Sequence, residues 1–304
     1  MVHILVMSET ALMLHRLCRS PRKLVLMFKG RTLVIATKHA KEEVIAPILE
    51  EALGVLCVTT EDLDTDLLGT FTGEVERTLD PIETAREKCN RAMNAMGCDL
   101  AIASEGSFGP HPAVFFVAGD DEILVLVDRA NELEIVAREV STATNFSAED
   151  VDTEADLLAF AEKAQFPSHA LILRKSAKSP QGIYKGITDR ESLLDTFRGL
   201  QRRYGGAYVE TDMRAMHNPS RMKVIADATH RLVELLKSEC PQCGTPGFTV
   251  TDVIRGLPCE LCALPTKAPQ AHVSTCAKCG YSAQEDYPNG KRTENPMYCE
   301  FCNP

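Results

Sequence analysis

The sequence predicts an α/β protein with a mixed central sheet flanked by helices and a small cysteine-rich module at its C-terminal end. Short apolar runs at residues 32–36 and 99–103 have the length and composition of strands buried between helices. Residues 44–53 instead repeat apolar side chains at the period of a helix that packs on a sheet. Four Cys-x-x-Cys pairs, all beyond residue 239, set the last part of the chain apart.

The sequence divides the chain into three segments. Residues 1–26 have neither a basic region ahead of their apolar stretch nor a small-residue cleavage site, which argues against a signal peptide. We expect this extension to lie outside the fold, with the physiological start at Met27. Residues 27–238 form the predicted α/β domain, and residues 239–304 form the cysteine-rich module.

Net charge, hydropathy and cysteine spacing indicate which ligands and which cellular compartment suit the protein. The 304 residues carry a formal net charge of −10, which disfavours nucleic-acid binding by bulk electrostatics and suits a ligand that arrives with a cation. No apolar run approaches the roughly 20 residues that cross a membrane. The cysteines outside the pairs are scattered, as is typical of thiols in a reducing compartment, so we expect a cytoplasmic protein: Cys18, Cys57, Cys89 and Cys98.

The predicted elements alternate through the first half of the domain. After the strand at 32–36, Pro47 lies within or at the start of the next helix, and residues 55–58 form a second strand. Asp80 as N-cap, with Pro81 and Glu83 behind it, predicts a helix that ends at Gly97.

A β-rich stretch comes next. Residues 113–117 and 123–127 are expected to pair as a hairpin across Gly119, Asp120 and Asp121, with residues 134–140 extending the sheet. Further on we expect helices at 154–165 and 189–203, strands at 169–173 and 207–210, and a helix from Pro219 that continues to Cys240.

Candidate ligand-binding side chains gather in three polar segments. A polar loop at 104–112 is expected at the carboxyl edge of the sheet, where open α/β folds bind ligands, although a plain Gly/Pro turn explains it too. The loop after the first strand has an anion-binding arrangement, unless its lysines are merely solvated. Arginines in a third segment are possible anchors for a substrate phosphate or base. The candidates are Thr37, Lys38, His39, Lys41, Ser104, Glu105, Ser107, His111, Arg214, His217 and Arg221.

The cysteine pairs have the spacing of metal ligands. Two Cys-x-x-Cys pairs supply four thiolates to one ion and leave no open catalytic position, which predicts a two-zinc ribbon with structural ions. We expect neighbouring pairs to share an ion, with a cross-braced arrangement of alternate pairs as the alternative. The module has few basic residues, so a buttress, a lid or a protein contact surface fits it better than nucleic-acid binding. The ligands are Cys240, Cys243, Cys259, Cys262, Cys276, Cys279, Cys299 and Cys302.

Three segments in one order resemble the inosine/xanthosine triphosphate pyrophosphatase (Maf-like) superfamily over residues 31–140. These are the loop 37–41, the helix segment 83–92 and the strand 99–106. The resemblance implies that Lys41 binds phosphate, that Glu83 and Glu105 are catalytic and hold Mg²⁺, and that His217 and Arg221 recognise a base. His39 stands where that superfamily usually has asparagine, and its Asp-Asp-Ser-Gly signature is absent. The whole chain also resembles an uncharacterised bacterial family with a C-terminal zinc ribbon.

The resemblance therefore implies a Mg²⁺-dependent hydrolase of a nucleotide or related phosphoanhydride. The alternative is a non-catalytic nucleotide-sensing or adaptor protein whose zinc ribbon docks a protein or RNA partner. An RNA-modifying enzyme is a third hypothesis, which the net negative charge disfavours.

Overall fold

The computed structural model describes residues 26–60, 79–177, 179 and 182–304. They divide into two compact units, one ending at Val233 and one containing residues 234–304, and each is described by itself. The predicted extension at residues 1–26 falls outside the described residues except for its last one.

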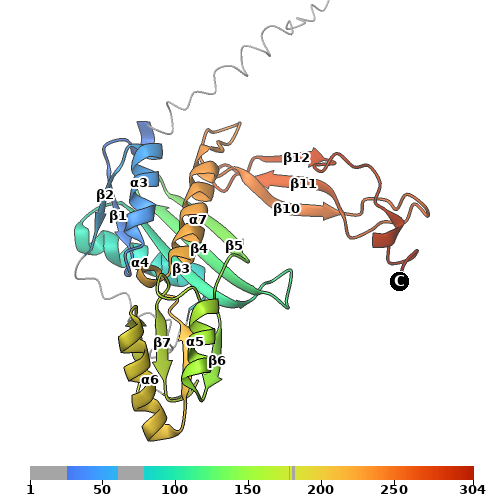
Figure 1. The fold of residues 1–304 in the computed structure, drawn as a ribbon. Coiled ribbons are helices and arrows are strands. Elements are labelled where there is room, and N and C mark those ends of the chain that lie inside the picture. Colours follow the sequence, from blue (N-terminus) through green and yellow to red (C-terminus); the bar gives the residue numbers. More distant parts are fainter. Residues whose placement is uncertain (1–25, 61–78, 178, 180–181) are drawn as a thin grey trace, which may run out of the picture. The chain divides into compact units, whose positions relative to one another are not determined.

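A five-stranded mixed sheet forms the first half of the larger unit (Figure 1). The strands lie in the order β2-β1-β3-β4-β5, and the first three are parallel while β4 and β5 run antiparallel to their neighbours. This mixed α/β architecture confirms the predicted fold class. The strands are β1 (Thr32–Ala36), β2 (Leu56–Thr59), β3 (Leu100–Pro110), β4 (Ala118–Asp128) and β5 (Leu133–Ser141).

Helix α4 (Pro81–Met96) covers one face of this sheet. Asp80 Oδ1 accepts hydrogen bonds from the backbone N–H groups of Ile82 (2.8 Å) and Glu83 (3.0 Å), so the predicted N-cap is confirmed. Gly97 ends the helix in the left-handed conformation, as predicted. Every second side chain of β1, β3 and β4 packs against this helix in an apolar layer that includes Val34, Ala101 and Val125.

The predicted hairpin across Gly119–Asp121 is wrong. β3 continues through the expected polar loop to Pro110, β4 starts at Ala118, and the turn lies at residues 111–117. His111 holds this turn, because its Nδ1 accepts hydrogen bonds from the backbone N–H groups of Ala113 (3.2 Å) and Val114 (3.1 Å). The apolar residues 113–117, expected as a strand, therefore lie in the turn, and the side chain of Phe115 is 80% exposed.

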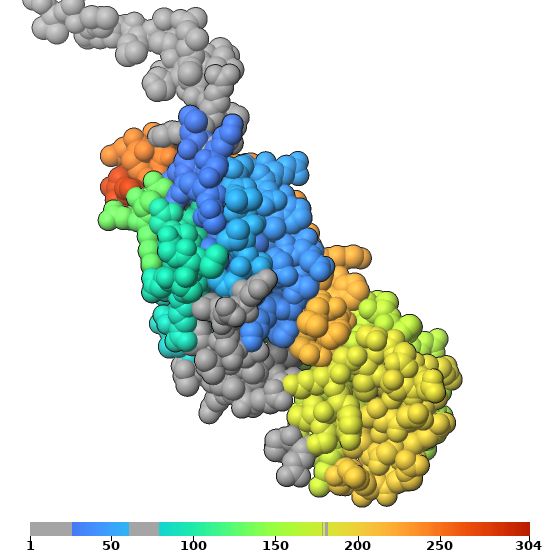
Figure 2. Space-filling view, turned by 90° about the vertical axis from the view of Figure 1, so that its left-hand side faces the viewer, coloured from blue at the N-terminus to red at the C-terminus, as the bar shows by residue number. Residues whose placement is uncertain are grey.

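The rest of the larger unit contains a four-stranded antiparallel sheet in the order β6-β9-β7-β8. Helices α5 (Glu154–Lys163) and α6 (Arg190–Tyr204) pack on it around a core that includes Phe160, Phe197 and Val209. The segment around α6 (yellow) forms outer surface of this part in Figure 2. The strands are β6 (Ala148–Val151), β7 (Leu171–Arg174), β8 (Tyr184–Ile187) and β9 (Ala207–Thr211), and a short 3-10 turn at Ala215–His217 leads to α7 (Pro219–Lys237).

The smaller unit is built on a three-stranded antiparallel sheet, β10 (Thr249–Arg255), β11 (Pro269–Thr275) and β12 (Ser282–Asp286), and also has a 3-10 turn at Pro296–Tyr298. From residue 240 onward its buried apolar side chains are four cysteines, Pro246, Leu257 and Ala271. This is too small a core to hold the unit together by apolar burial alone. In the described part of the chain no helix has the length and hydropathy to cross a membrane.

Candidate functional site

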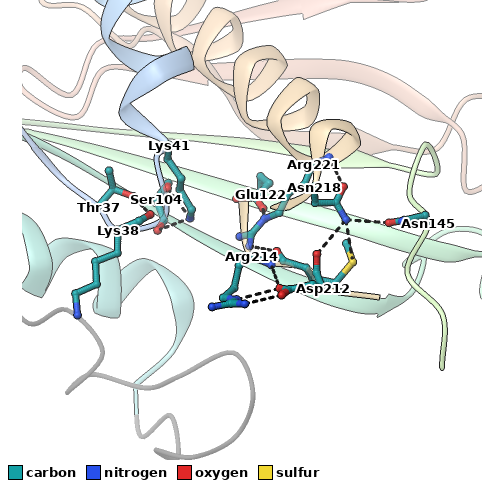
Figure 3. A network of polar contacts seen from close by, with 11 residues as sticks. Thr37, Lys38, Lys41, Ser104, Glu122, Asn145, Asp212, Arg214, Asn218 and Arg221 are labelled. Atoms are coloured by element: carbon teal, nitrogen blue, oxygen red, sulfur yellow. Dashed lines mark hydrogen bonds and ion pairs between the residues drawn. The ribbon is translucent and has the colours of Figure 1, made fainter. Parts of the chain in front are cut away.

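A buried lysine lies where β1 leads into α3 (Glu42–Leu53), and the loop before it has an unusual backbone. His39 and Ala40 adopt positive φ angles of 70° and 61°, a conformation that residues other than glycine rarely use. The Lys41 side chain is buried, and its Nζ donates hydrogen bonds to Ser104 Oγ (2.9 Å) and Ser104 O (3.4 Å) (Figure 3). Among the described residues, Lys41 therefore contacts neutral hydrogen-bond partners and no carboxylate.

Burial lowers the pKa of Lys41 to about 8, and the charge of Arg221 lowers it further in the same direction. The carboxylates of Glu122 and Glu105 act in the opposite direction but do not offset burial. At neutral pH most Lys41 side chains are still protonated. Lys41 is therefore a buried cation with no adjacent counterion in the part of the chain that the structure describes.

Arg221, at the start of α7, approaches the same face of the sheet. Its Nε donates a hydrogen bond to Glu122 Oε1 (2.6 Å), and its Nη1 donates to the carbonyl of Met213. The guanidinium carbon lies 5.0 Å from the ring centroid of Phe108. Asn218 accepts a hydrogen bond from the backbone N–H of Arg221 (3.0 Å) and so caps the start of α7. Figures 1 and 3 show α3 and α7 side by side over this face.

Gly106 makes the approach of Arg221 possible. It pairs with Glu122 across the β3–β4 ladder, so both residues face α7. A Cβ atom at Gly106 would come closer than 3.0 Å to both the Arg221 guanidinium and the Glu122 carboxylate. Gly106 thus leaves room for an internal ion pair.

Two carboxyl groups that the sequence analysis did not select lie on this face. Asp120 and Glu122 are fully buried, two residues apart on β4. Among the described residues, no group donates a hydrogen bond to either Asp120 oxygen or to Glu122 Oε2. Burial, followed by the negative charge of Glu122, raises the pKa of Asp120 to about 8. Asp120 is therefore protonated at neutral pH.

The proton on Asp120 determines the net charge of the site. Lys41 and Arg221 contribute two positive charges, Glu122 one negative charge, and protonated Asp120 none. We name these four residues the Lys41 cluster. With its formal charge of +1 the cluster attracts an anion, and its oxygens carry too little negative charge to hold a divalent cation.

Glu105 lies on the opposite face of β3. It pairs with Ile123 in the layer under α4 and forms an ion pair with Lys88 of that helix. Glu83 is exposed in the first turn of α4, and no described contact joins it to Glu105 or to Lys41. The structure thus brings Lys41 and Ser104 together, places Glu105 within electrostatic reach of Lys41, and leaves Glu83 apart.

The third predicted segment surrounds a buried aspartate. Asp212 is fully buried and accepts hydrogen bonds from Arg214 Nε (3.0 Å), Arg214 Nη2 (2.6 Å) and the backbone N–H of Gly186 (3.0 Å). His217 lies close by, since a Cβ atom at Gly186 would be 3.0 Å from its Nε2. Burial lowers the pKa of His217, which favours its neutral form. Arg214 and Arg221 each already have a carboxylate partner.

The remaining candidates are more peripheral. Thr37 Oγ1 donates a hydrogen bond to the Lys38 carbonyl (3.1 Å), and Lys38 and His39 are half-buried in the loop. Ser107 lines a separate cavity of about 180 Å³ near Arg138. His111 holds the turn between β3 and β4, as described above.

The eight paired cysteines form two groups in the smaller unit, with alternate pairs together. Sequential pairing is therefore wrong and the cross-braced alternative is confirmed, because the antiparallel strands return the chain to each pair after one intervening pair. The first group contains Cys240, Cys243, Cys276 and Cys279; the second contains Cys259, Cys262, Cys299 and Cys302.

The sulfur positions fit a tetrahedral ion. Sulfur–sulfur distances are 3.6 and 3.7 Å in the first group and 3.7 and 3.9 Å in the second. Metal–sulfur bonds of about 2.3 Å give tetrahedral edges of about 3.8 Å. In each pair the carbonyl of the first cysteine accepts a hydrogen bond from the residue after the second, as from Gly244 (2.8 Å) and Gly280 (3.0 Å). Both groups can hold a metal ion.

Replacement of Gly106 by alanine tests the importance of the Arg221–Glu122 contact. We expect Gly106→Ala to reduce the free energy of unfolding by about 2 kcal/mol, because the methyl group displaces a buried ion pair. Gly109→Ala is the matched control on the same strand, since no atom lies within 4 Å of its added Cβ. Urea unfolding of both variants measures the difference, and equal losses would contradict the steric role of Gly106.

Replacement of Asp120 by asparagine tests whether Asp120 is protonated in the folded protein. A carboxyl whose pKa rises from 3.8 to about 8 on folding takes up a proton, so its contribution to stability is lost as pH increases from about 4 to about 8. Asp120→Asn removes this loss. We expect its melting temperature relative to wild type to be about 2–4 °C higher at pH 8 than at pH 5.

Asp121→Asn is the matched control for this experiment. Asp121 lies on the opposite face of β4 and pairs with Arg138 (2.6 Å). Its effect should be the same at both pH values. A pH-independent effect of Asp120→Asn would show that Asp120 is ionised in the folded protein.

Comparisons with known proteins complete the description. A structural match is the crystal structure of protein VC0702 from Vibrio cholerae, with 9% sequence identity, a TM-score of 0.33, and coverage of 67% of this chain and 94% of that one. No curated protein matches the sequence. The model of the DUF6671 domain, a domain of unknown function, matches residues 88–304, which include β3, β4, the four-stranded sheet and all eight paired cysteines. The chain therefore belongs to the DUF6671 family.

Proposed function

We propose that the larger unit binds a phosphorylated compound at the Lys41 cluster and hydrolyses a phosphoanhydride, with a nucleotide as the substrate class. The observation that carries this proposal is the buried Lys41 ammonium with neutral hydrogen-bond partners in a site of formal charge +1. An unneutralised buried cation costs free energy, and an anionic ligand recovers that cost. Helix α3 begins directly after Lys41, so the positive end of its dipole lies beside the same anion.

Lys41 would neutralise a phosphate oxygen, and Arg221 would act from the other side while its Nε stays bound to Glu122. Mg²⁺ fits this site only as a partner of the substrate phosphates. Among the described residues, three or more metal-ligand side chains converge only in the two cysteine groups. Glu105, for which the superfamily resemblance implied this role, is buried on the opposite face of β3 from the Lys41 cluster and is paired with Lys88, so we assign no protein carboxylate to such an ion. Glu83 is too remote from Glu105 for the role that the superfamily resemblance implied.

A second function is supported by the surface of the smaller unit. Large apolar side chains beside the second cysteine group are exposed, including Leu261 (74%), Tyr298 (66%) and Phe301 (72%). Exposed apolar groups of this size are typical of protein contact surfaces. We keep a nucleotide-sensing adaptor as the alternative, with a protein partner at this surface. A cytoplasmic location remains a prediction from the sequence.

We also propose that both cysteine groups hold structural zinc. Each offers four sulfurs and no open position, as in closed structural sites, and the unit has almost no other core. Zinc would then contribute on the order of 10 kcal/mol per site to folding.

A nucleotide assay tests the hydrolase. Wild type should release phosphate or pyrophosphate from one of a panel of nucleoside triphosphates in the presence of Mg²⁺. Lys41→Met should weaken nucleotide binding at least about tenfold in calorimetry, because a charge-assisted hydrogen bond is lost. Binding of pyrophosphate by wild type should weaken above pH 8, as free Lys41 loses its proton.

The outcomes separate the two functions. Lys163→Met, an exposed lysine of α5, is the matched control and should leave binding unchanged. Binding without turnover selects the adaptor. Equal affinity of wild type and Lys41→Met for every nucleotide would falsify the proposed site.

Double cysteine variants test both the metal and the pairing. Metal analysis of wild type should find two zinc ions per chain. The double variant Cys240→Ser, Cys276→Ser alters only one cross-braced group and should retain one ion. The double variant Cys240→Ser, Cys259→Ser alters both groups and should retain none firmly bound. The reverse ranking is expected from sequential pairing, so it would contradict the cross-braced arrangement.

A further inference from the structure

A second ligand-sized space lies in the four-stranded part of the larger unit. Its volume is about 310 Å³, within the range of small-molecule sites, and it is bounded by the start of β8 and the end of α6. Tyr184, Arg202, Arg203 and Tyr204 line it. None of these residues belongs to the Lys41 cluster or to the cysteine groups. We name this space the tyrosine–arginine cavity.

The arginines of this cavity differ from most others in the unit. Arg138, Arg174 and Arg198 each form an ion pair with a carboxylate. Within the described part of the chain, neither Arg202 nor Arg203 has such a partner, although the protein carries a net charge of −10. Their position in the last turn of α6 complements the helix dipole. That role alone does not explain why both unpaired guanidinium groups line one cavity.

The tyrosines add aromatic surface to this positive charge. Tyr184 and Tyr204 are 44% and 43% exposed, far more than a core aromatic residue. Lys175 Nζ lies 4.9 Å from the ring centroid of Tyr204, which brings a third cation to the cavity margin. Gly199 leaves the wall open, since no atom lies within 4 Å of a Cβ built there. The described residues that line the cavity include no acidic side chain.

We propose that the tyrosine–arginine cavity binds a nucleotide unit, with the base stacked on a tyrosine ring and the phosphate bound by Arg202 and Arg203. Exposed aromatic rings accept any base as a stacking partner, and guanidinium groups bind phosphate oxygens with paired hydrogen bonds. The combination of unpaired arginines and exposed tyrosines favours this ligand over a simple anion, which needs no ring, and over an apolar ligand, which needs no charge. The unit is either a free nucleotide or a nucleotide of a single RNA strand.

The site is independent of the proposed hydrolase, because it uses a different sheet and different residues. The experiment is therefore carried out in the Lys41→Met background, which removes the other phosphate site. Calorimetry measures the binding of adenosine 5′-monophosphate and of a 5′-phosphorylated adenosine tetraribonucleotide. Tyrosine fluorescence reports base stacking directly, since the chain has six tyrosines and no tryptophan.

The expected result is saturable binding with tyrosine quenching. Tyr184→Leu and Tyr204→Leu together should weaken binding about tenfold and remove the quenching. Arg202→Gln with Arg203→Gln should weaken binding by a similar factor and flatten its salt dependence. Arg198→Gln is the matched control on the same helix, because Arg198 is paired with Glu154 (2.7 Å) and does not line the cavity.

Each outcome decides a point. Equal affinities for the two probes assign the site to free nucleotides, and a tetranucleotide that binds at least tenfold more tightly assigns it to RNA. The absence of binding at millimolar probe overturns the proposal. Unchanged affinity in the double arginine variant, or an equal loss in Arg198→Gln, also overturns it. Circular dichroism of each variant confirms that its fold is retained, since the altered side chains are exposed.

Discussion

The larger unit depends on one constraint, which is that its buried positive charges are not fully neutralised by buried negative charges. Lys41 and Arg221 reach one face of the five-stranded sheet. There Glu122 contacts Arg221 directly, while Lys41 contacts Ser104. A deprotonated Asp120 would balance the charge, but burial and the neighbouring Glu122 keep its proton in place. The contact also requires a glycine at position 106, because a side chain there would displace the guanidinium. The proposed anion affinity of the site thus follows from how β4 and α7 pack.

The smaller unit has almost no apolar core, so its fold must depend on other interactions. Its strands bring alternate Cys-x-x-Cys pairs together, and the turns inside the pairs supply backbone hydrogen bonds that orient the sulfurs. A cross-braced arrangement ties the beginning of the unit to its middle and its middle to its end. Loss of either group would therefore loosen strands that the other group does not hold.

Local sequence signals accounted for the helices well and for the β3–β4 hairpin badly. The cap at Asp80 and the stop at Gly97 depend on neighbouring residues alone, so they were predictable. The hairpin depends on pairing over a longer range, and Gly119-Asp120-Asp121 had the local composition of a turn. Because Asp120 was expected in a turn, the sequence did not indicate that it is buried. It therefore did not reveal the Asp120 and Glu122 pair that sets the net charge of the site. An acid two residues from another, directly before an apolar strand, was the available signal.

By itself the sequence determined the α/β class, the metal-ligand character of the eight cysteines and the candidacy of Lys41, because these depend on composition, period and spacing. Tertiary structure alone decided which cysteine pairs lie together, which face of β3 each side chain occupies, and that Glu105 contacts Lys88 while Ser104 contacts Lys41. The physical reason is that strand register and chain return join residues distant in sequence. A shift of one residue in a strand moves every side chain to the other face.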